Sequence, residues 1–128
     1  MFELEGIDHV ALAVRSPAAS ARWYVDVLGF ELRHVGMWDG VPLFVRTGTT
    51  ALALFPVNAV EPLARPARSI TMLHVAFRAT GRDFAAAQKE LTLRRIAFHF
   101  EDHDISHSIY FSDPDGHALE ITTYDVAR

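Results

Sequence analysis

The sequence contains no cysteine, which excludes disulfide bonds, thiolate metal ligands and a cysteine nucleophile. It is also short of basic residues, because 12 Lys and Arg stand against 16 Asp and Glu, for a formal net charge of −4. An acidic balance without a cluster of Lys and Arg argues against a nucleic-acid footprint and against an anionic membrane surface. We therefore expect neither nucleic acid nor membrane among the partners of this chain.

Long hydrophobic runs are missing as well. No apolar stretch approaches the roughly 18–20 residues that a membrane-spanning helix needs. The opening MFELEGIDHV has no basic segment followed by an apolar run, so we expect no signal peptide. Half of the 128 residues are hydrophobic, which is enough to build one core. The expectation is a single compact cytoplasmic domain that covers residues 1–128.

What the chain does contain is a series of elements that occurs twice. In the first half, IDHVALAV predicts a strand and SPAASARWYVDVLGF a helix that is capped by Ser16 and stopped by Gly29. FELRHVGM, VPLFVRT and TALALFP then predict three strands. In the second half, ITMLHVAFRA predicts a strand, GRDFAAAQKELTLRR a helix, and IAFHFED, SIYFSD and HALEITTY three more strands.

The two halves also align residue by residue. A shift of sixty-five residues places His9 on His74 and aligns the two H-V-A strands. The shared order predicts an α+β protein built from two tandem βαβββ modules. We place module 1 at about residues 1–57, a linker at about 58–69 and module 2 at about 70–128.

Three predicted strands carry an ionisable side chain among small neighbours. Alternation along a strand puts His9 on one face with two alanines, His74 beside Ala76, and Glu120 beside Ala118. Small neighbours leave a hollow, and two imidazoles with one carboxylate form the ligand set of a facial metal site with open positions. A divalent ion would also offset the cost of burying the carboxylate. Taken singly, a histidine on a strand is more often a hydrogen-bonded structural residue than a ligand, and a glutamate near a chain end is usually solvated.

These residues, with the motifs IDHVALAV, WYVDVLGFEL, LHVAFRA and SIYFSDPDGHALEIT, resemble the vicinal oxygen chelate superfamily. It includes glyoxalase I, extradiol dioxygenases, fosfomycin-resistance thiol transferases and bleomycin-resistance proteins. The resemblance covers nearly the whole chain and implies paired modules whose curved mixed sheets surround a central cavity. It also implies that His9, His74 and Glu120 hold a metal ion, and that the protein forms a homodimer.

Within the superfamily, the resemblance favours an extradiol, catechol-type ring-cleaving dioxygenase, an oxidoreductase that uses Fe2+ or Mn2+. Tyr110 precedes Glu120 by ten residues, as the active-site tyrosine of those enzymes does, and His103 matches their preceding histidine. Alternation along the hairpin also puts Ser108 and Tyr110 on the same face as Glu120. Both are therefore candidate catalytic residues. One position departs from the pattern, because Thr49 stands where such dioxygenases carry an acid–base histidine.

Two other functions remain open. A glyoxalase-type lyase or isomerase, or a fosfomycin-type thiol transferase, would use a similar site with a divalent metal such as Zn2+ or Ni2+. A metal-free protein that sequesters a ligand, like the bleomycin-binding relatives, would not need His9, His74 and Glu120. Each alternative has a small-molecule partner, and the site could be completed within one chain or between two.

Overall fold

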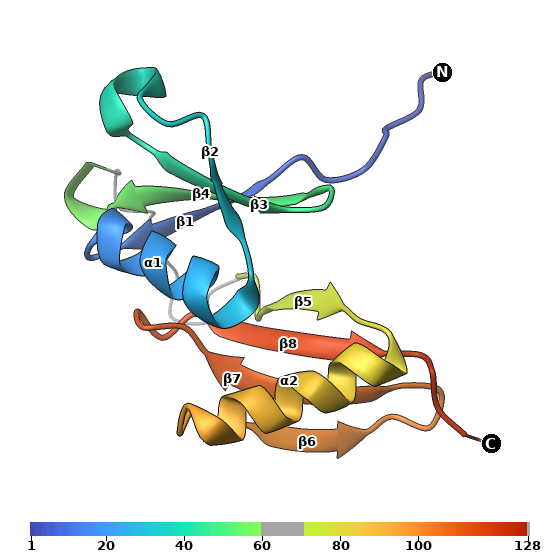
Figure 1. The fold of residues 1–128 in the computed structure, drawn as a ribbon. Helices are drawn as coiled ribbons and strands as arrows, with labels where there is room; N and C mark the ends of the chain where they lie inside the picture. Colours follow the sequence, from blue (N-terminus) through green and yellow to red (C-terminus); the bar gives the residue numbers. More distant parts are fainter. Residues whose placement is uncertain (60–70, 128) are drawn as a thin grey trace. The chain divides into compact units, whose positions relative to one another are not determined.

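The computed structural model describes residues 1–59 and 71–127, which form two compact units, one from each of these ranges (Figure 1). Nearly all of the linker expected at about 58–69 lies outside the described residues. Within the described ranges, no helix combines the length and the apolar character that crossing a bilayer requires. Each unit contains a strand, a helix and three further strands, in that order.

The first unit is a four-stranded mixed sheet with one α-helix. The sheet order is β1-β4-β3-β2, in which β1 pairs with β4 in parallel and the other neighbours are antiparallel. Two short 3-10 turns, η1 and η2, complete the unit. The elements are β1 (Val10–Val14), α1 (Pro17–Leu28), β2 (Glu31–Arg33), η1 (Met37–Gly40), β3 (Leu43–Thr47), β4 (Thr50–Pro56) and η2 (Val57–Ala59).

The second unit repeats this topology strand for strand. Its sheet order is β5-β8-β7-β6, again with a parallel pair between the first and last strands of the unit. The predicted α+β class with two mixed sheets is therefore confirmed, whereas a cavity enclosed by the sheets stays a prediction. The elements are β5 (Val75–Arg78), α2 (Gly81–Leu93), β6 (His99–Asp102), β7 (His107–Ser112) and β8 (Ala118–Thr123).

Both helices begin where the sequence supplies a hydroxyl cap. The side chain of Ser16 accepts a hydrogen bond from the amide of Ala19, and Pro17 opens α1, where a missing N–H costs nothing. Gly29 ends the helix in the left-handed region with φ of 72°. In α2 the hydroxyl of Thr80 accepts from the amide of Asp83 in the same way. The predicted bounds of the first helix are confirmed.

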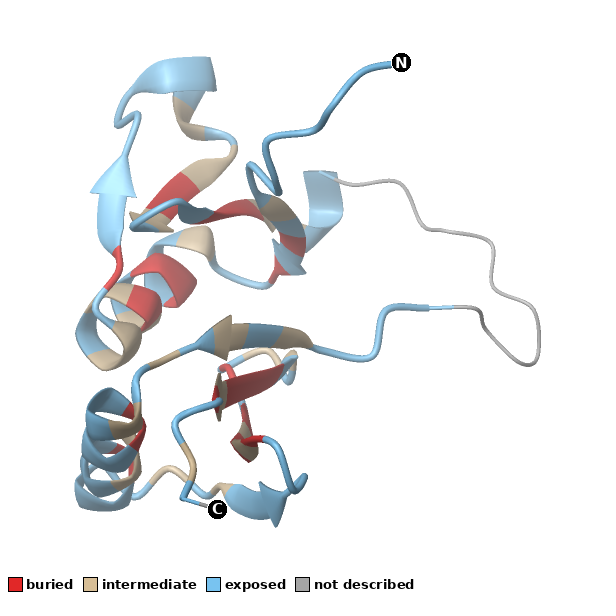
Figure 2. Cartoon of the chain, turned by 90° about the vertical axis from the view of Figure 1, so that its right-hand side faces the viewer, coloured by how far each residue is buried: buried red, intermediate tan, exposed pale blue. Residues whose placement is uncertain are grey.

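Buried residues occur in the helix and in the sheet of each unit (Figure 2), and most of those on the bulky face of the sheet are apolar. In the second unit Ile109, Leu119 and Ile121 share one face of the sheet by register, and Phe84 of α2 meets Phe100 of β6 with ring centroids 6.3 Å apart. The opposite face of the second sheet carries more polar residues, among them Ser108, Tyr110 and Glu120.

Two strand predictions need correction. The strand expected in FELRHVGM ends at Arg33, because His34 has a φ of 56° and turns the chain into a loop that contains η1. The two H-V-A strands begin after their histidines, at Val10 and Val75, not before them. Among the described residues both are edge strands with a single neighbour, and their parallel ladders start only at these valines.

Candidate metal and substrate site

The polar face of the second sheet collects most of the candidate residues. Glu120 in β8 lies between Ala76 of β5 and Tyr110 of β7, and Ser108 is paired with Thr122. Paired residues point to the same side of a sheet. The register therefore confirms the predicted alternation, in which Ser108 and Tyr110 share a face with Glu120.

The carboxylate of Glu120 is held at both oxygens. His74 Nε2 lies 2.8 Å from Glu120 Oε1, and Ser108 Oγ donates to Glu120 Oε2 at 2.6 Å. The Glu120 side chain is only 10% exposed, whereas that of His74 is 37% exposed. A buried carboxylate needs such partners, because leaving it unpaired costs several kcal/mol. The result is a fixed acid with an imidazole beside it at the edge of the solvent.

This pair fits two neighbouring ligands of one divalent ion. Bonds of about 2.1 Å that meet at a right angle place two donor atoms on the order of 3 Å apart. The observed 2.8 Å between Nε2 and Oε1 is close to that spacing. Imidazole and carboxylate are also donors that first-row divalent metals accept together. Among residues 1–59 and 71–127, however, no three His, Asp or Glu side chains form a group that could hold a metal.

Tyr110 lies next to this pair and contacts His103. Its hydroxyl is 2.9 Å from His103 Nε2, and its ring is 5.8 Å from the ring of His74, edge to face. Burial raises the pKa of the Tyr110 phenol above its usual value, and the negative charge of Glu120 raises it further. The phenol therefore stays protonated at neutral pH and can donate a hydrogen bond. The structure brings both predicted catalytic residues together.

Two residues near Tyr110 were missed by sequence reasoning. The alternation of side chains along its strand put Ser108 on this face but gave it no role. Its hydrogen bond to Glu120 makes it a positioning residue. Glu101 lies between two imidazoles, with its oxygens 3.6 Å from His99 Nε2 and 3.8 Å from His103 Nε2. Alternation in HFED, laid against HSIYFS, could have placed Glu101 on this face, but only once the pairing of the two strands was known.

His9 belongs to the first unit and is oriented by its sequence neighbour. Its Nδ1 lies 2.8 Å from Asp8 Oδ2, and the hydrogen bond from His9 lowers the pKa of Asp8. With Nδ1–H donated to a carboxylate, Nε2 keeps the lone pair that binds a metal, an arrangement typical of histidine ligands. Because His74 and Glu120 belong to the second unit, the triad as a whole stays a prediction.

Thr49 lies exposed in the turn between β3 and β4. A threonine hydroxyl has no imidazole-like acid–base capacity near neutral pH, so it cannot replace the histidine that the dioxygenase pattern has at this place. Any proton transfer in such a reaction would depend on other residues, and the pair of Tyr110 and His103 is suitably built for it.

Comparison with known sequences gives one family and several relatives. The family model described as Glyoxalase/Bleomycin resistance protein/Dioxygenase superfamily matches residues 6–121. A metallothiol transferase FosB from Staphylococcus epidermidis is 30% identical over 123 residues, which cover 94% of this chain and 84% of that protein. A catechol-2,3-dioxygenase from Bacillus subtilis (strain 168) is also 30% identical, over 117 residues that cover 90% of this chain and 40% of that protein.

Solved structures with low sequence identity share the fold. A lactoylglutathione lyase from Agrobacterium tumefaciens superposes with a TM-score of 0.73 at 21% identity, covering 94% of each chain. A glyoxylase/bleomycin resistance protein/dioxygenase domain from Frankia sp. EAN1pec gives 0.76 at 22% identity, covering 98% of this chain and 96% of that one. The architecture of paired four-stranded sheets is therefore the one these proteins have.

Proposed function

Because this chain belongs to the Glyoxalase/Bleomycin resistance protein/Dioxygenase superfamily, we propose that it is a metal-dependent enzyme whose small substrate binds through two neighbouring oxygens. The reaction that we favour is extradiol cleavage of a catechol. The observation that carries the proposal is the contact of His74 with Glu120, at 2.8 Å, beside the hydrogen-bonded pair of Tyr110 and His103. Similarity to a catechol dioxygenase over 90% of this chain supports the same choice.

His9, His74 and Glu120 would hold the ion, with Fe2+ or Mn2+ as the expected metals. When bound, such an ion supplies Lewis-acid and one-electron chemistry to the oxygens of the substrate. Ser108 fixes the orientation of Glu120 through the 2.6 Å hydrogen bond, and Asp8 fixes that of His9. Partners of this kind typically contribute tenfold or more to metal affinity.

Tyr110 and His103 would handle the substrate and its proton. The raised pKa of Tyr110 keeps its hydroxyl protonated, so it can donate a hydrogen bond to a substrate oxygen on the polar face. His103 Nε2, 2.9 Å away, can return a proton to Tyr110 or accept one from it. The His103 side chain is itself 43% exposed, which gives that proton a route to solvent without an acid–base group at Thr49.

A thiol transferase is the second candidate. It is favoured by the similarity to metallothiol transferases, which extends over 94% of this chain and 84% of the relative. The same donor set and the same tyrosine could serve either reaction, since the chemistry is then decided by the co-substrate. A glyoxalase-type lyase has the fold in its favour, and a metal-free binding protein has no specific feature of the site in its favour.

Metal binding tests the first half of the proposal. Protein purified without chelators is stripped and titrated with Mn2+ by calorimetry, and we expect one ion per chain. His9→Ala and Glu120→Gln should each weaken binding at least about tenfold, because the first removes a donor and the second removes the negative charge of one. His34→Ala, a histidine in the same unit as His9, is the matched control. Substoichiometric metal that His9→Ala and Glu120→Gln leave unchanged would favour the metal-free binding function over the enzyme.

Turnover tests the second half. Protein loaded with Fe2+ without air is mixed with a panel of catechols, and oxygen uptake is recorded. We expect uptake that Tyr110→Phe and His103→Ala reduce by about a hundredfold, the scale of general acid–base catalysis. A parallel assay follows loss of a thiol in the presence of an epoxide. Thiol loss without oxygen uptake would transfer the assignment to the thiol transferase.

A further inference from the structure

The hydrogen bond between His103 and Tyr110 has two possible directions. Its two atoms, His103 Nε2 and the phenol oxygen, lie 2.9 Å apart, and each of them can donate or accept. A neutral imidazole carries its proton on one nitrogen only, so the direction depends on which nitrogen of His103 is protonated. A carboxylate beside the ring can decide this, because it favours an N–H on the nitrogen that faces it.

Glu101 supplies such a carboxylate at the nitrogen in question. Its Oε2 lies 3.8 Å from His103 Nε2, the same atom that contacts Tyr110. Glu101 pairs with Ser108 across the register of β6 and β7, so it belongs to the polar face of the second sheet. At this distance the contact is electrostatic and not a hydrogen bond. A lone pair on Nε2 would be repelled by the negative charge, whereas an N–H would be attracted to it.

The surroundings of the Tyr110 hydroxyl favour the same direction. Burial, the charges of Glu120 and Glu101, and a hydrogen bond to Glu120 raise the pKa of the phenol, while a hydrogen bond with Ser108 lowers it. A phenol has a single proton, and a proton shared with Glu120 is not available to His103. The oxygen of Tyr110 is then left to accept the N–H of His103.

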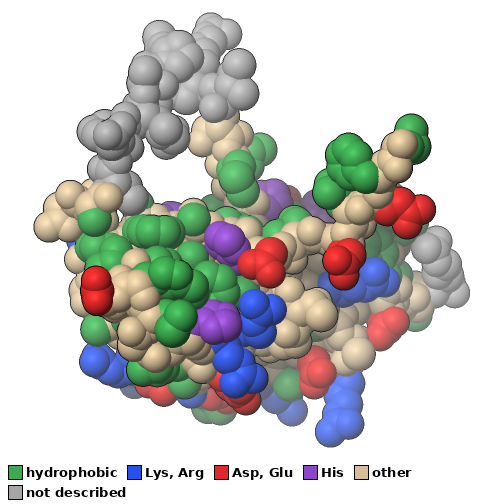
Figure 3. All heavy atoms as spheres, turned by 90° about the horizontal axis from the view of Figure 1, so that it is seen from above, with side chains coloured by type: hydrophobic (Ala, Val, Ile, Leu, Met, Phe, Trp, Pro, Cys, Tyr) green, Lys and Arg blue, Asp and Glu red, His purple; other side chains and the backbone are tan. Residues whose placement is uncertain are grey.

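Contacts between a carboxylate and an imidazole also occur elsewhere, and Figure 3 shows histidine side chains with charged groups beside them on the face in view. Asp8 contacts Nδ1 of His9, and Asp113 contacts Nδ1 of His117, each at 2.8 Å. Each of these acids orients one histidine. Glu101 differs from them, because the nitrogen that it faces also contacts a candidate catalytic tyrosine.

We propose that Glu101 is a positioning residue that keeps the N–H of His103 on Nε2, so that Tyr110 accepts there and directs its own proton to the polar face. The inference rests on the proposed function in one respect, because it takes Tyr110 to be the group that donates to the substrate. It adds one residue to the site and assigns the donor and the acceptor in the contact of His103 with Tyr110.

Imidazole nitrogen-15 NMR of the metal-free full chain tests the tautomer directly. Protonated and unprotonated ring nitrogens differ in shift, and the signals that His103→Ala lacks identify this ring. In mildly alkaline buffer we expect His103 to carry its proton on Nε2. Glu101→Gln removes the charge with little change of shape, and it should raise the Nδ1–H fraction about threefold, the scale of an exposed charge contact. Glu101→Asp keeps the charge and should restore most of the Nε2–H form.

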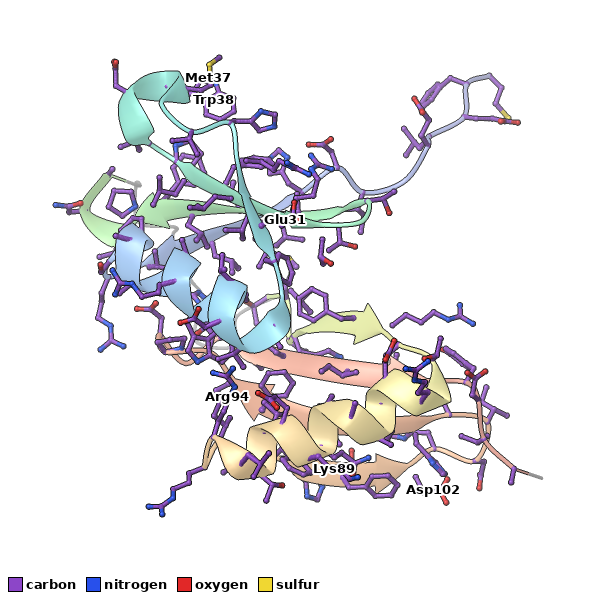
Figure 4. The ribbon with its side chains drawn as sticks, in the orientation of Figure 1. Glu31, Met37, Trp38, Lys89, Arg94 and Asp102 are labelled. Carbon is purple, nitrogen blue, oxygen red and sulfur yellow. The ribbon has the colours of Figure 1, made fainter. Side chains whose placement is uncertain are left out.

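Asp102→Asn is the matched control. Asp102 is the neighbouring residue, labelled at the end of β6 in Figure 4, and its carboxylate lies 3.5 Å from His107 on the other side of the strand. An asparagine can still accept the hydrogen bond from the amide of Asp104, so it retains the loop. The control should leave the His103 tautomer unchanged. An Nδ1–H form in the unmodified protein, or equal changes in Glu101→Gln and Asp102→Asn, would overturn the proposal.

Turnover distinguishes this role from a structural one. In protein loaded with Fe2+, Glu101→Gln should lower kcat for catechol about tenfold and leave KM nearly unchanged, because the substrate still binds while the Tyr110 proton is misdirected. Asp102→Asn should change neither constant. An unchanged kcat in Glu101→Gln, despite an altered tautomer, would overturn the positioning role alone. An Nε2–H form that depends on Glu101, in a protein without turnover under any metal, would remove the dioxygenase and leave the tautomer assignment in place.

Discussion

The buried carboxylate of Glu120 accepts a hydrogen bond from one serine hydroxyl, which we expect to stabilise the fold. Its Oε2 accepts a hydrogen bond from Ser108, which is itself fully buried. We predict that Ser108→Ala lowers the free energy of unfolding by about 1.5–3 kcal/mol, the range for a hydrogen bond to a charged group. Urea denaturation of the metal-free protein measures this. Ser112→Ala, on the same face of β7 but exposed, should change stability by less than about 0.5 kcal/mol. Similar losses in both variants would contradict the positioning role.

Tyr110 gives a prediction about pH. Burial, with the charge of Glu120, raises the pKa of its phenol above the ordinary value of 10.0. Folding therefore favours the neutral phenol, so its contribution to stability is complete below pH 10.0 and is lost as pH rises through the raised pKa. Unfolding free energies of the metal-free protein and of Tyr110→Phe, measured across that window, should differ in slope. Absorbance titration should show one late-ionising tyrosinate that the variant lacks, and identical profiles would refute this.

The two helices offer a matched pair of caps. Ser16 and Thr80 each accept a hydrogen bond from the amide three residues later, at 3.2 Å in both cases. We predict that Ser16→Ala and Thr80→Ala each cost about 1 kcal/mol of unfolding free energy, whereas Ser16→Asp retains the stability, because aspartate also caps well. Denaturant unfolding followed by circular dichroism checks this. An unchanged Ser16→Ala protein would mean that Pro17 and Gly29 suffice to define α1.

Elements with local signals were predicted well from the sequence. The bounds of α1 follow from Ser16, Pro17 and Gly29, and TALALFP matches β4 residue for residue. The strand expected over FELRHVGM was too long, because a histidine in the sequence does not by itself predict the positive φ that His34 adopts. His34 also packs against Phe44, with ring centroids 5.2 Å apart, a tertiary contact that residue type alone does not reveal.

The sequence predicted the position of a site residue only where that position depends on a single strand or a single hairpin. Alternation placed Tyr110 and Glu120 on one face, and the register confirms it. The contact of His74 with Glu120 depends on the parallel pairing of β5 with β8, which is not a local property, and the sequence reached it through family resemblance. Glu101 was missed because its place on this face depends on the pairing of β6 with β7.

The homodimer expected from the sequence leads to a prediction for the molecule in solution. The segments that precede the edge strands β1 and β5 expose several large apolar side chains, Phe2, Leu4, Ile7, Met72 and Leu73. In each unit taken by itself, exposed apolar groups beside a strand edge are typical of surfaces that another chain covers. We predict that light scattering gives twice the chain mass of 14.3 kDa. A mass of one chain at all concentrations would contradict the prediction.

The parallel pairing of the first and last strands in each unit also determines when the polar face can exist at all. Glu120 is encoded 46 positions after His74, and both depend on β8 lying beside β5. During synthesis the imidazole is therefore made before its carboxylate. The second unit cannot assemble its acid–imidazole pair as a nascent fragment, so capture of a cation there has to follow translation of the final strand.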